Sequence, residues 1–224
     1  MLIDDNFQAQ PSGTHVPSDG SQIGGVDPTT PYAPIVLPNG ALYSAIESAP
    51  VPGQYPTVMT YFDRPVLNPT GSSLTLDFDL YLGPGYPTSV NAVETDTILV
   101  TAGATPTTTV KRNLSLQNIR GQMYLILSNA WAAIPGATPG LFTQGARYHH
   151  TISYAFGPDS AAILSVAIND TVYEVPSSMQ KADISASNWS PVAAMQLQQS
   201  LLPTGKGASF GLIFDKAMYT WPVA

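Results

Sequence analysis

The sequence predicts an all-β protein: a two-sheet antiparallel β-sandwich of the jelly-roll type. Three observations predict it. Roughly nine to eleven segments carry strand patterns. Turn signals separate them about every 8 to 15 residues. No long amphipathic helical stripe alternates with the strands, which excludes a parallel βαβ architecture. The 224 residues suffice for one large domain of this kind.

The clearest strand is residues 73–82, where apolar and polar side chains alternate. One face of this strand holds five large apolar side chains and fits a core: Leu74, Leu76, Phe78, Leu80 and Leu82. The other face holds polar side chains that could meet water, a cation or a sugar: Thr75, Asp77, Asp79 and Tyr81. This strand is therefore expected in the sandwich, with one buried face.

The N-terminal segment differs from the rest of the chain. Residues 1–35 are rich in Pro, Gly and Ser, and they offer too little apolar surface to offset their conformational entropy. We expect them to form an extended arm, with a candidate first strand at 2–7. Residues 36–224 are expected to form a single β-sandwich domain.

Further strand patterns occur at 57–62, 96–101, 147–156, 161–168, 171–175 and 208–221. Two short turns predict hairpins, at Arg120-Gly121 and Asn169-Asp170. Residues 130–146 and 176–191 are predicted to be loops, which would place Trp131 and Trp189 at the surface. Residues 192–202 fit either a strand or a short helix.

Composition excludes several functions. Eight Lys and Arg residues are scattered through a chain of net charge −7, so no patch neutralises phosphates and nucleic-acid binding is not expected. The absence of cysteine removes disulfides, thiolate metal sites and a cysteine nucleophile. No apolar run reaches the roughly 18 residues of a membrane span, so membrane insertion is not expected. The first residues lack the pattern of a signal peptide.

Two segments resemble the concanavalin A-like lectin/glucanase superfamily. Residues 145–154 followed by 162–172 are similar to the pattern W-H-H-V-x-x-x-Y and an Asn-Gly hairpin of its laminin-G-like branch, with Tyr148 and Asp170 replacing Trp and Gly. Residues 210–219 are similar to the closing strand of such domains. The resemblance implies a fold in which the terminal strands lie together, with residues 3–7 as the partner of the last strand. It carries no activity by itself.

Asp77 and Asp79 are the sharpest catalytic candidates. Residues i and i+2 of a strand lie roughly 6.5–7 Å apart at Cα, and paired carboxylates can cleave glycosides. Family-16-type glucanases of this superfamily carry E-x-D-x-x-E on one strand, whereas this strand has D-F-D and no third acid. A solvated or ligand-contacting face therefore fits better than an active site.

The histidines are weaker candidates for a metal site or for catalysis. His149 and His150 are adjacent, so on a strand they face opposite ways and cannot share a metal. The Gln-x-His and Arg-x-Glu-x-Arg strands that mark alginate-lyase-like relatives of this fold are absent. A lyase pair of His150 with Tyr154 has no further support.

No cofactor is expected, and the one cation candidate is a loose acidic loop containing Asn91, Glu94 and Asp96, which could hold Ca²⁺ without matching a calcium-loop spacing. Flat aromatic side chains can stack on sugars. The candidate ligand-binding residues are therefore Trp131, Trp189, Asp77, Asp79 and Tyr81.

These features lead us to expect a non-enzymatic surface or structural protein of a virion or the cell exterior, such as a virion decoration, tail or filament component. The arm would link copies of the chain or other assembly subunits, and glycan binding could accompany this role. The alternative is a secreted carbohydrate-binding, lectin-like module. The third hypothesis is a polysaccharide-degrading enzyme that uses Asp77 and Asp79.

Overall fold

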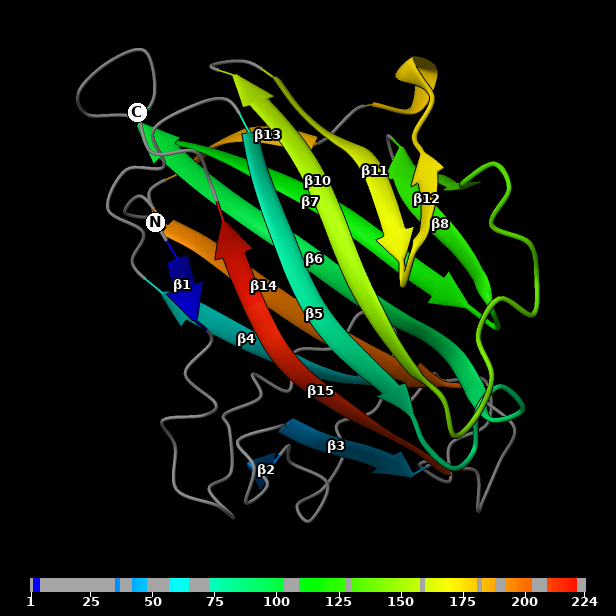
Figure 1. The fold of residues 1–224 in the computed structure, drawn as a ribbon. Coiled ribbons are helices and arrows are strands. Elements are labelled where there is room, and N and C mark those ends of the chain that lie inside the picture. Colours follow the sequence, from blue (N-terminus) through cyan, green and yellow to red (C-terminus); the bar gives the residue numbers. More distant parts are fainter. Residues whose placement is uncertain are drawn as a thin grey trace.

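Figure 1 shows the computed structural model of the chain, in which nearly every described segment is a β-strand. The structure describes residues 2–4, 35–36, 42–47, 57–64, 73–102, 109–127, 130–157, 160–180, 183–187, 192–202 and 209–220. Within these ranges the helical structure is a single 3-10 turn, Ser177–Met179, and no helix there is long and apolar enough to cross a membrane. The predicted all-β class is confirmed.

The first sheet, sheet A, has eight strands in the order β12-β11-β10-β5-β15-β3-β2, and β1 also pairs with β15. Its strands are β1 (Leu2–Asp4), β2 (Ile35–Val36), β3 (Leu42–Glu47), β5 (Ser73–Leu82), β10 (Arg147–Gly157), β11 (Ser160–Ile168), β12 (Thr171–Glu174) and β15 (Ser209–Thr220). Leu2 lies opposite Thr220. The expected pairing of the two terminal strands is therefore confirmed.

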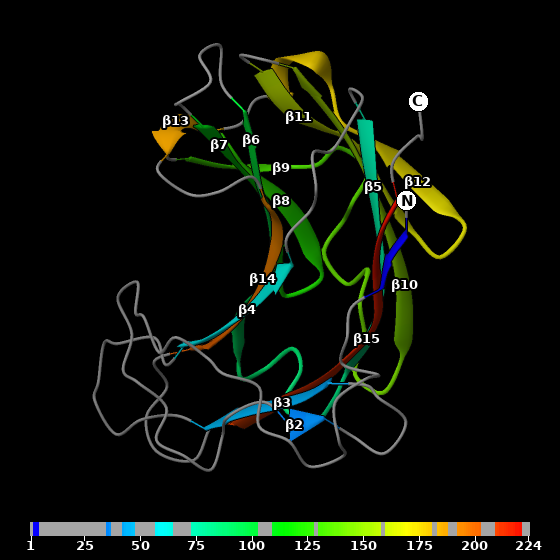
Figure 2. The same ribbon diagram turned by 90° about the vertical axis from the view of Figure 1, so that its left-hand side faces the viewer.

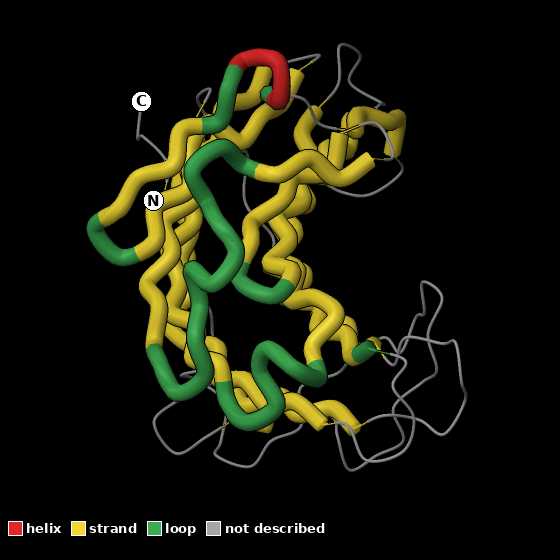
Figure 3. Tube along the Cα trace, turned by 90° about the vertical axis from the view of Figure 1, so that its right-hand side faces the viewer, coloured by secondary structure: helices red, strands yellow, loops and turns green. Residues whose placement is uncertain are grey.

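The second sheet, sheet B, has seven strands in the order β4-β14-β6-β7-β8-β9, with β13 paired to β7. Its strands are β4 (Thr57–Arg64), β6 (Val90–Ala102), β7 (Thr109–Ile119), β8 (Gln122–Leu127), β9 (Ala130–Ala133), β13 (Asp183–Ser187) and β14 (Val192–Leu201). Figures 2 and 3 show that sheet B curves, with its concave face turned away from sheet A.

The core lies between the two sheets, and β5 supplies its central row. Leu76 and Leu82 are fully buried, and Phe78 is 1% exposed. Sheet B contributes apolar side chains such as Leu116 and Met123 to the same core. The predicted buried face of residues 73–82 is confirmed, because alternate residues of a strand point to one layer.

Cross-strand pairing changes four sequence-based assignments. The predicted loop at 176–191 contains strand β13, which pairs with β7. The predicted loop at 130–146 begins with strand β9, so Trp131 stands on an edge strand. Strand β6 starts at Val90, six residues before the predicted start at Asp96. The ambiguous segment at 192–202 is strand β14, held between β4 and β6. The predicted arm, apart from β1 and Ile35, lies outside the described residues, as does Trp189.

The β7–β8 hairpin has the geometry of a type I′ turn, with φ of 49° at Arg120 and 90° at Gly121. Glycine is required at the second position for a further reason. A Cβ on Gly121 would lie 2.6 Å from the backbone nitrogen of Gly140. The hairpin and the loop that follows β9 are thus packed backbone against backbone. The second predicted hairpin, β11–β12, has φ of 52° at Asn169.

His150 is buried in the core, whereas His149 is exposed, so the expected opposite orientation of the two histidines is confirmed. The His150 ring stacks on Phe78 at 4.5 Å and on Phe142 at 5.7 Å between centroids. Its Nδ1 lies 3.2 Å from the Tyr148 carbonyl oxygen. Burial disfavours the imidazolium and lowers the pKa of His150 to about 4.

This burial predicts acid lability. The unfolded chain takes up the His150 proton near pH 6.5, whereas the folded protein takes it up only near pH 4. The free energy of unfolding should therefore fall as the pH drops through this window, by roughly 3 kcal/mol at its lower end. His150→Phe keeps the ring stack and removes the titration. Urea unfolding at several pH values should show a flatter acid limb in the variant, and parallel limbs would contradict the assignment.

Candidate functional site

The outward face of β6 carries two acids. Val93 and Thr95 line a small cavity between the sheets together with Phe78. Because side chains alternate along a strand, Glu94 and Asp96 point the other way, to the concave face of sheet B. Strand β6 is central in that sheet, with β14 on one side and β7 on the other.

The sheet register surrounds these acids with neutral hydrogen-bond donors. Gln198 of β14 and Gln117 of β7 both lie opposite Glu94. The Gln117 Nε2 donates to Glu94 Oε2 at 2.9 Å, and the Gln198 Nε2 approaches the same oxygen at 3.5 Å. Ser115 lies opposite Asp96 and hydrogen-bonds its carboxyl. Glu94 and Asp96 also hydrogen-bond each other. We call these five residues the carboxyl-pair site.

Burial governs the protonation of this pair, since Glu94 and Asp96 are each only 9% exposed. Burial raises the pKa of both carboxyls, and the neighbouring Asp96 charge raises the pKa of Glu94 further. Two carboxyls in hydrogen-bond contact cannot both ionise in such surroundings, so the pair holds one shared proton at neutral pH. The Asp96 Oδ1 atom is buried and has no hydrogen-bond partner among the described residues.

Aromatic side chains lie on the same face. Tyr124 of β8 stands opposite Gln117, and Ala133 of β9 stands opposite Tyr124. Trp131 is two residues from Ala133 on β9 and therefore shares its face. Its side chain is 37% exposed. The structure thus places Trp131, one of the predicted ligand contacts, on the face that carries the carboxyl-pair site.

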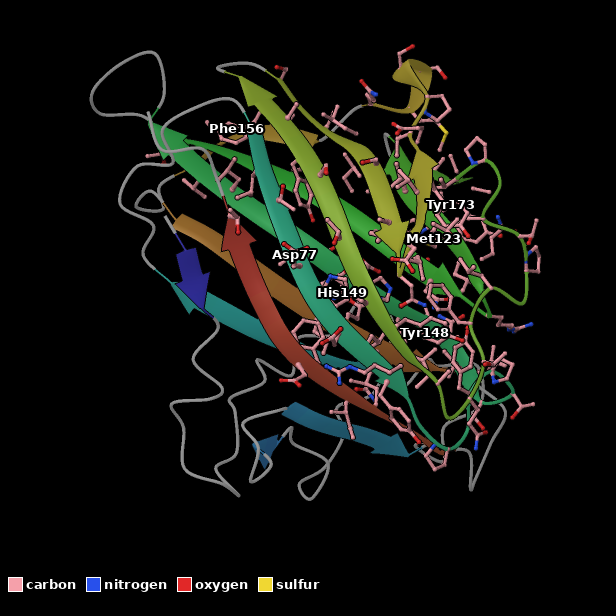
Figure 4. The ribbon with its side chains drawn as sticks, in the orientation of Figure 1. Asp77, Met123, Tyr148, His149, Phe156 and Tyr173 are labelled. Carbon is pink, nitrogen blue, oxygen red and sulfur yellow. The ribbon has the colours of Figure 1, made fainter. Side chains whose placement is uncertain are left out.

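Asp77, labelled in Figure 4, and Asp79 alternate with the buried residues of β5 and so lie on the opposite outer face of the sandwich, that of sheet A. Arg147 pairs with Asp79 and lies 3.8 Å from Asp215. His149 Nδ1 lies 3.0 Å from Asp79 Oδ1. Thr151 Oγ1 donates to Asp77 Oδ1 at 2.6 Å. We call these groups the outer charged network.

Asp77 and Asp79 find hydrogen-bond and ion-pair partners within the outer charged network itself. Burial alone would raise the pKa of Asp79, but hydrogen bonds from Arg147 and His149 outweigh it and hold that pKa below its usual range. Tyr81 lies at the end of this face, opposite Arg147. Sheet A therefore separates Asp77, Asp79 and Tyr81 from Trp131, and ligand contact by these three residues stays a prediction.

The structure changes two further sequence-based assignments, the His150–Tyr154 pair and the acidic loop. His150 and Tyr154 both face the core, where the Tyr154 hydroxyl accepts a hydrogen bond from Thr97 Oγ1 at 2.8 Å, so no polysaccharide can reach them as a lyase pair. Asn91, Glu94 and Asp96 all lie within strand β6, so they do not form the predicted acidic loop. Within the described ranges no group of three or more acidic or histidine side chains could hold a metal ion.

Sequence reasoning missed the catalytic potential of Glu94 and Asp96. A signal was present, because they have the same i, i+2 spacing that singled out Asp77 and Asp79. Residues 94–96 also supply the first two acids of the pattern E-x-D-x-x-E. Leu99 stands at the third position and is buried in the core, 1% exposed.

Comparisons with solved structures show the same fold. A mutant of the alginate lyase Aly36B in complex with alginate trisaccharide is 10% identical, with a TM-score of 0.53 over 99% of this chain and 98% of the other. The endo-1,3-beta-glucanase from Streptomyces sioyaensis is 12% identical, with a TM-score of 0.51 over 99% of this chain and 96% of the other. No family model and no curated protein sequence matches the chain.

These matches confirm the concanavalin A-like jelly-roll fold that the sequence resembles. They also overturn the expectation of a non-enzymatic virion, capsid-decoration or filament protein. Solved structures that match nearly the whole chain with a TM-score above 0.5 include polysaccharide-degrading enzymes, an alginate lyase and a glucanase. The composition had suggested a display protein, but low charge and missing cysteines constrain solvation and redox chemistry, not catalysis.

The carboxyl-pair site predicts a pH effect of opposite sign to that of His150. As the pH rises above about 4.5, the unfolded chain releases the Glu94 proton while the folded protein retains it. The free energy of unfolding should therefore fall towards alkaline pH. Glu94→Gln removes this titration and keeps an amide that can hydrogen-bond Asp96. Urea unfolding should show a smaller alkaline loss in the variant, and an unchanged loss would contradict proton sharing.

Proposed function

We propose that the protein is an enzyme that cleaves glycosidic bonds of a polysaccharide at the concave face of sheet B. The observation that carries this proposal is the buried Glu94–Asp96 pair, which holds a proton at neutral pH on a face turned away from the core. Polysaccharide-degrading enzymes of the same fold support it.

The held proton fits general-acid catalysis. A carboxylic acid that stays protonated at neutral pH can donate to the glycosidic oxygen as the bond to the anomeric carbon breaks, a contribution of roughly 10²–10⁴-fold. Gln117 and Gln198 both donate to Glu94 Oε2 and so orient this carboxyl. In hydrolysis, the hydroxyl of a water then joins the anomeric carbon, and the remaining proton of that water returns to the pair.

The closeness of the two carboxyls defines their role. Glycosidases that divide two roles between two carboxyls separate them by roughly 5–5.5 Å for retention or 6.5–9.5 Å for inversion. Glu94 and Asp96 interact directly on one face of β6, so they titrate as a pair rather than as two separate groups. We therefore assign the pair one joint role, in which Glu94 donates the proton and Asp96 carries the negative charge.

Charge favours an uncharged substrate. The chain carries a net charge of −7. The described polar side chains around the pair are neutral donors and acceptors: Ser115, Gln117, Tyr124 and Gln198. A polyuronate would bring further negative charge to two acids without a cation among these neighbours. A neutral glucan would instead use amides and hydroxyls for its own hydroxyl groups.

The test is turnover by paired variants. Wild-type protein should release reducing ends from β-1,3-glucan. Glu94→Gln and Asp96→Asn should each lower kcat/KM by about 100-fold or more, because the first removes the proton donor and the second removes the carboxyl that carries the negative charge. Asp77→Asn, on sheet A, should keep wild-type turnover. Circular dichroism should show the same strand content in all four proteins.

Three results would contradict the proposal. Wild-type protein that cleaves neither β-1,3-glucan nor alginate would exclude the activity. Full turnover in both carboxyl-pair variants would exclude the site. Loss of turnover in Asp77→Asn alone would move the active site to the outer charged network.

A further inference from the structure

Trp131 is exposed without an evident structural reason. Trp131 and Val172 are the large hydrophobic side chains that stand exposed among the described residues. Trp131 lies on β9, the last strand of sheet B after β8. An indole left in water at the edge of a polar face is typical of a surface that receives an apolar or flat ligand.

The position of Trp131 is firmly held. Directly after β9, the Ile134 nitrogen donates to the Met123 carbonyl oxygen at 2.9 Å, and the Ile134 side chain is buried. Further along the loop, the Leu141 nitrogen donates to the Gly121 carbonyl oxygen at 3.2 Å. Strand β9 is therefore held by its pairing with β8 and by the anchored segment that follows it, so Trp131 presents its ring without a large ordering cost on binding.

One path across the strands joins the carboxyl-pair site to Trp131. The neighbours β6, β7, β8 and β9 follow one another in sheet B. With strands about 4.8 Å apart, the β6 and β9 backbones are separated by roughly 14 Å. Gln117 and Tyr124 occupy the intermediate strands on the same face. A single sugar ring cannot touch both ends of this path, whereas a chain of several sugars can.

We propose that Trp131 is a stacking platform for a distant sugar of a neutral polysaccharide laid across β6 to β9, with its cleavage point at Glu94 and Asp96. This inference rests on the proposed function and adds to it a preference for longer substrate chains. The flat indole covers the face of a sugar ring, and Tyr124 and Gln117 offer hydrogen bonds to the sugars between. Trp131 is a specificity residue, because it contacts the substrate far from the bond that breaks.

The experiment compares chain lengths. β-1,3-linked gluco-oligosaccharides from disaccharide to hexasaccharide are supplied to wild type, Trp131→Ala and Trp131→Phe. Trp131→Ala should lower kcat/KM for the longest oligomers by about 10-fold, the worth of one aromatic stacking contact. It should leave the shortest cleaved oligomer unchanged, and Trp131→Phe should restore most of the loss. Val172→Ala, the matched exposed apolar control on β12, should behave as wild type at every length.

The outcomes separate this inference from the proposed function. An equal loss at all lengths, or no loss at any length, overturns the platform while turnover stands. Calorimetry with the hexasaccharide tests binding without turnover. Hexasaccharide binding that Trp131→Ala abolishes in a protein without turnover supports the platform and overturns the enzyme. Neither binding nor turnover of any oligomer overturns both.

Discussion

The apolar layer between the two sheets decides where the polar side chains of this protein can stand. Strand β5 places Leu76, Phe78 and Leu80 in that layer, and β6 places Val93 and Leu99 there. Since alternate residues of a strand face opposite ways, the acids between them are forced onto the two outer faces. The sandwich thereby creates two polar faces, one on each sheet, from the same alternation.

The carboxyl groups on the two outer faces are stabilised in different ways. On sheet A, Asp79 is balanced by Arg147 and His149, which keeps its carboxylate ionised. On sheet B, Glu94 and Asp96 meet amides and a hydroxyl, so burial is offset by keeping a proton. A compensated network stabilises its own geometry, whereas a proton held at neutral pH is available for chemistry. The concave face is therefore the better candidate for catalysis.

There is a physical reason why composition was a poor guide to the function of this protein. Composition reports how a whole surface is solvated, and a charged content of 10% leaves that task to hydroxyls and amides. Catalysis depends on two or three groups in an unusual environment. The overall composition does not reveal the environment of two acids among fifteen Asp and Glu residues. Their burial and their neighbours on the concave face of sheet B distinguish these two acids from the others.

Local patterns in the sequence were sufficient for the strand class, the buried face of residues 73–82, the hairpins at Arg120 and Asn169, and the opposite orientation of His149 and His150. Each depends on neighbours a few residues apart. The β6 pattern was weaker, because Thr95 and Thr97 fill core positions with polar atoms and hide the alternation. Only the tertiary structure brought Gln117 and Gln198 to Glu94, since register between distant strands is set by long-range pairing. It alone decided that Trp131 shares a face with the carboxyl pair, and that Asp77 and Asp79 do not.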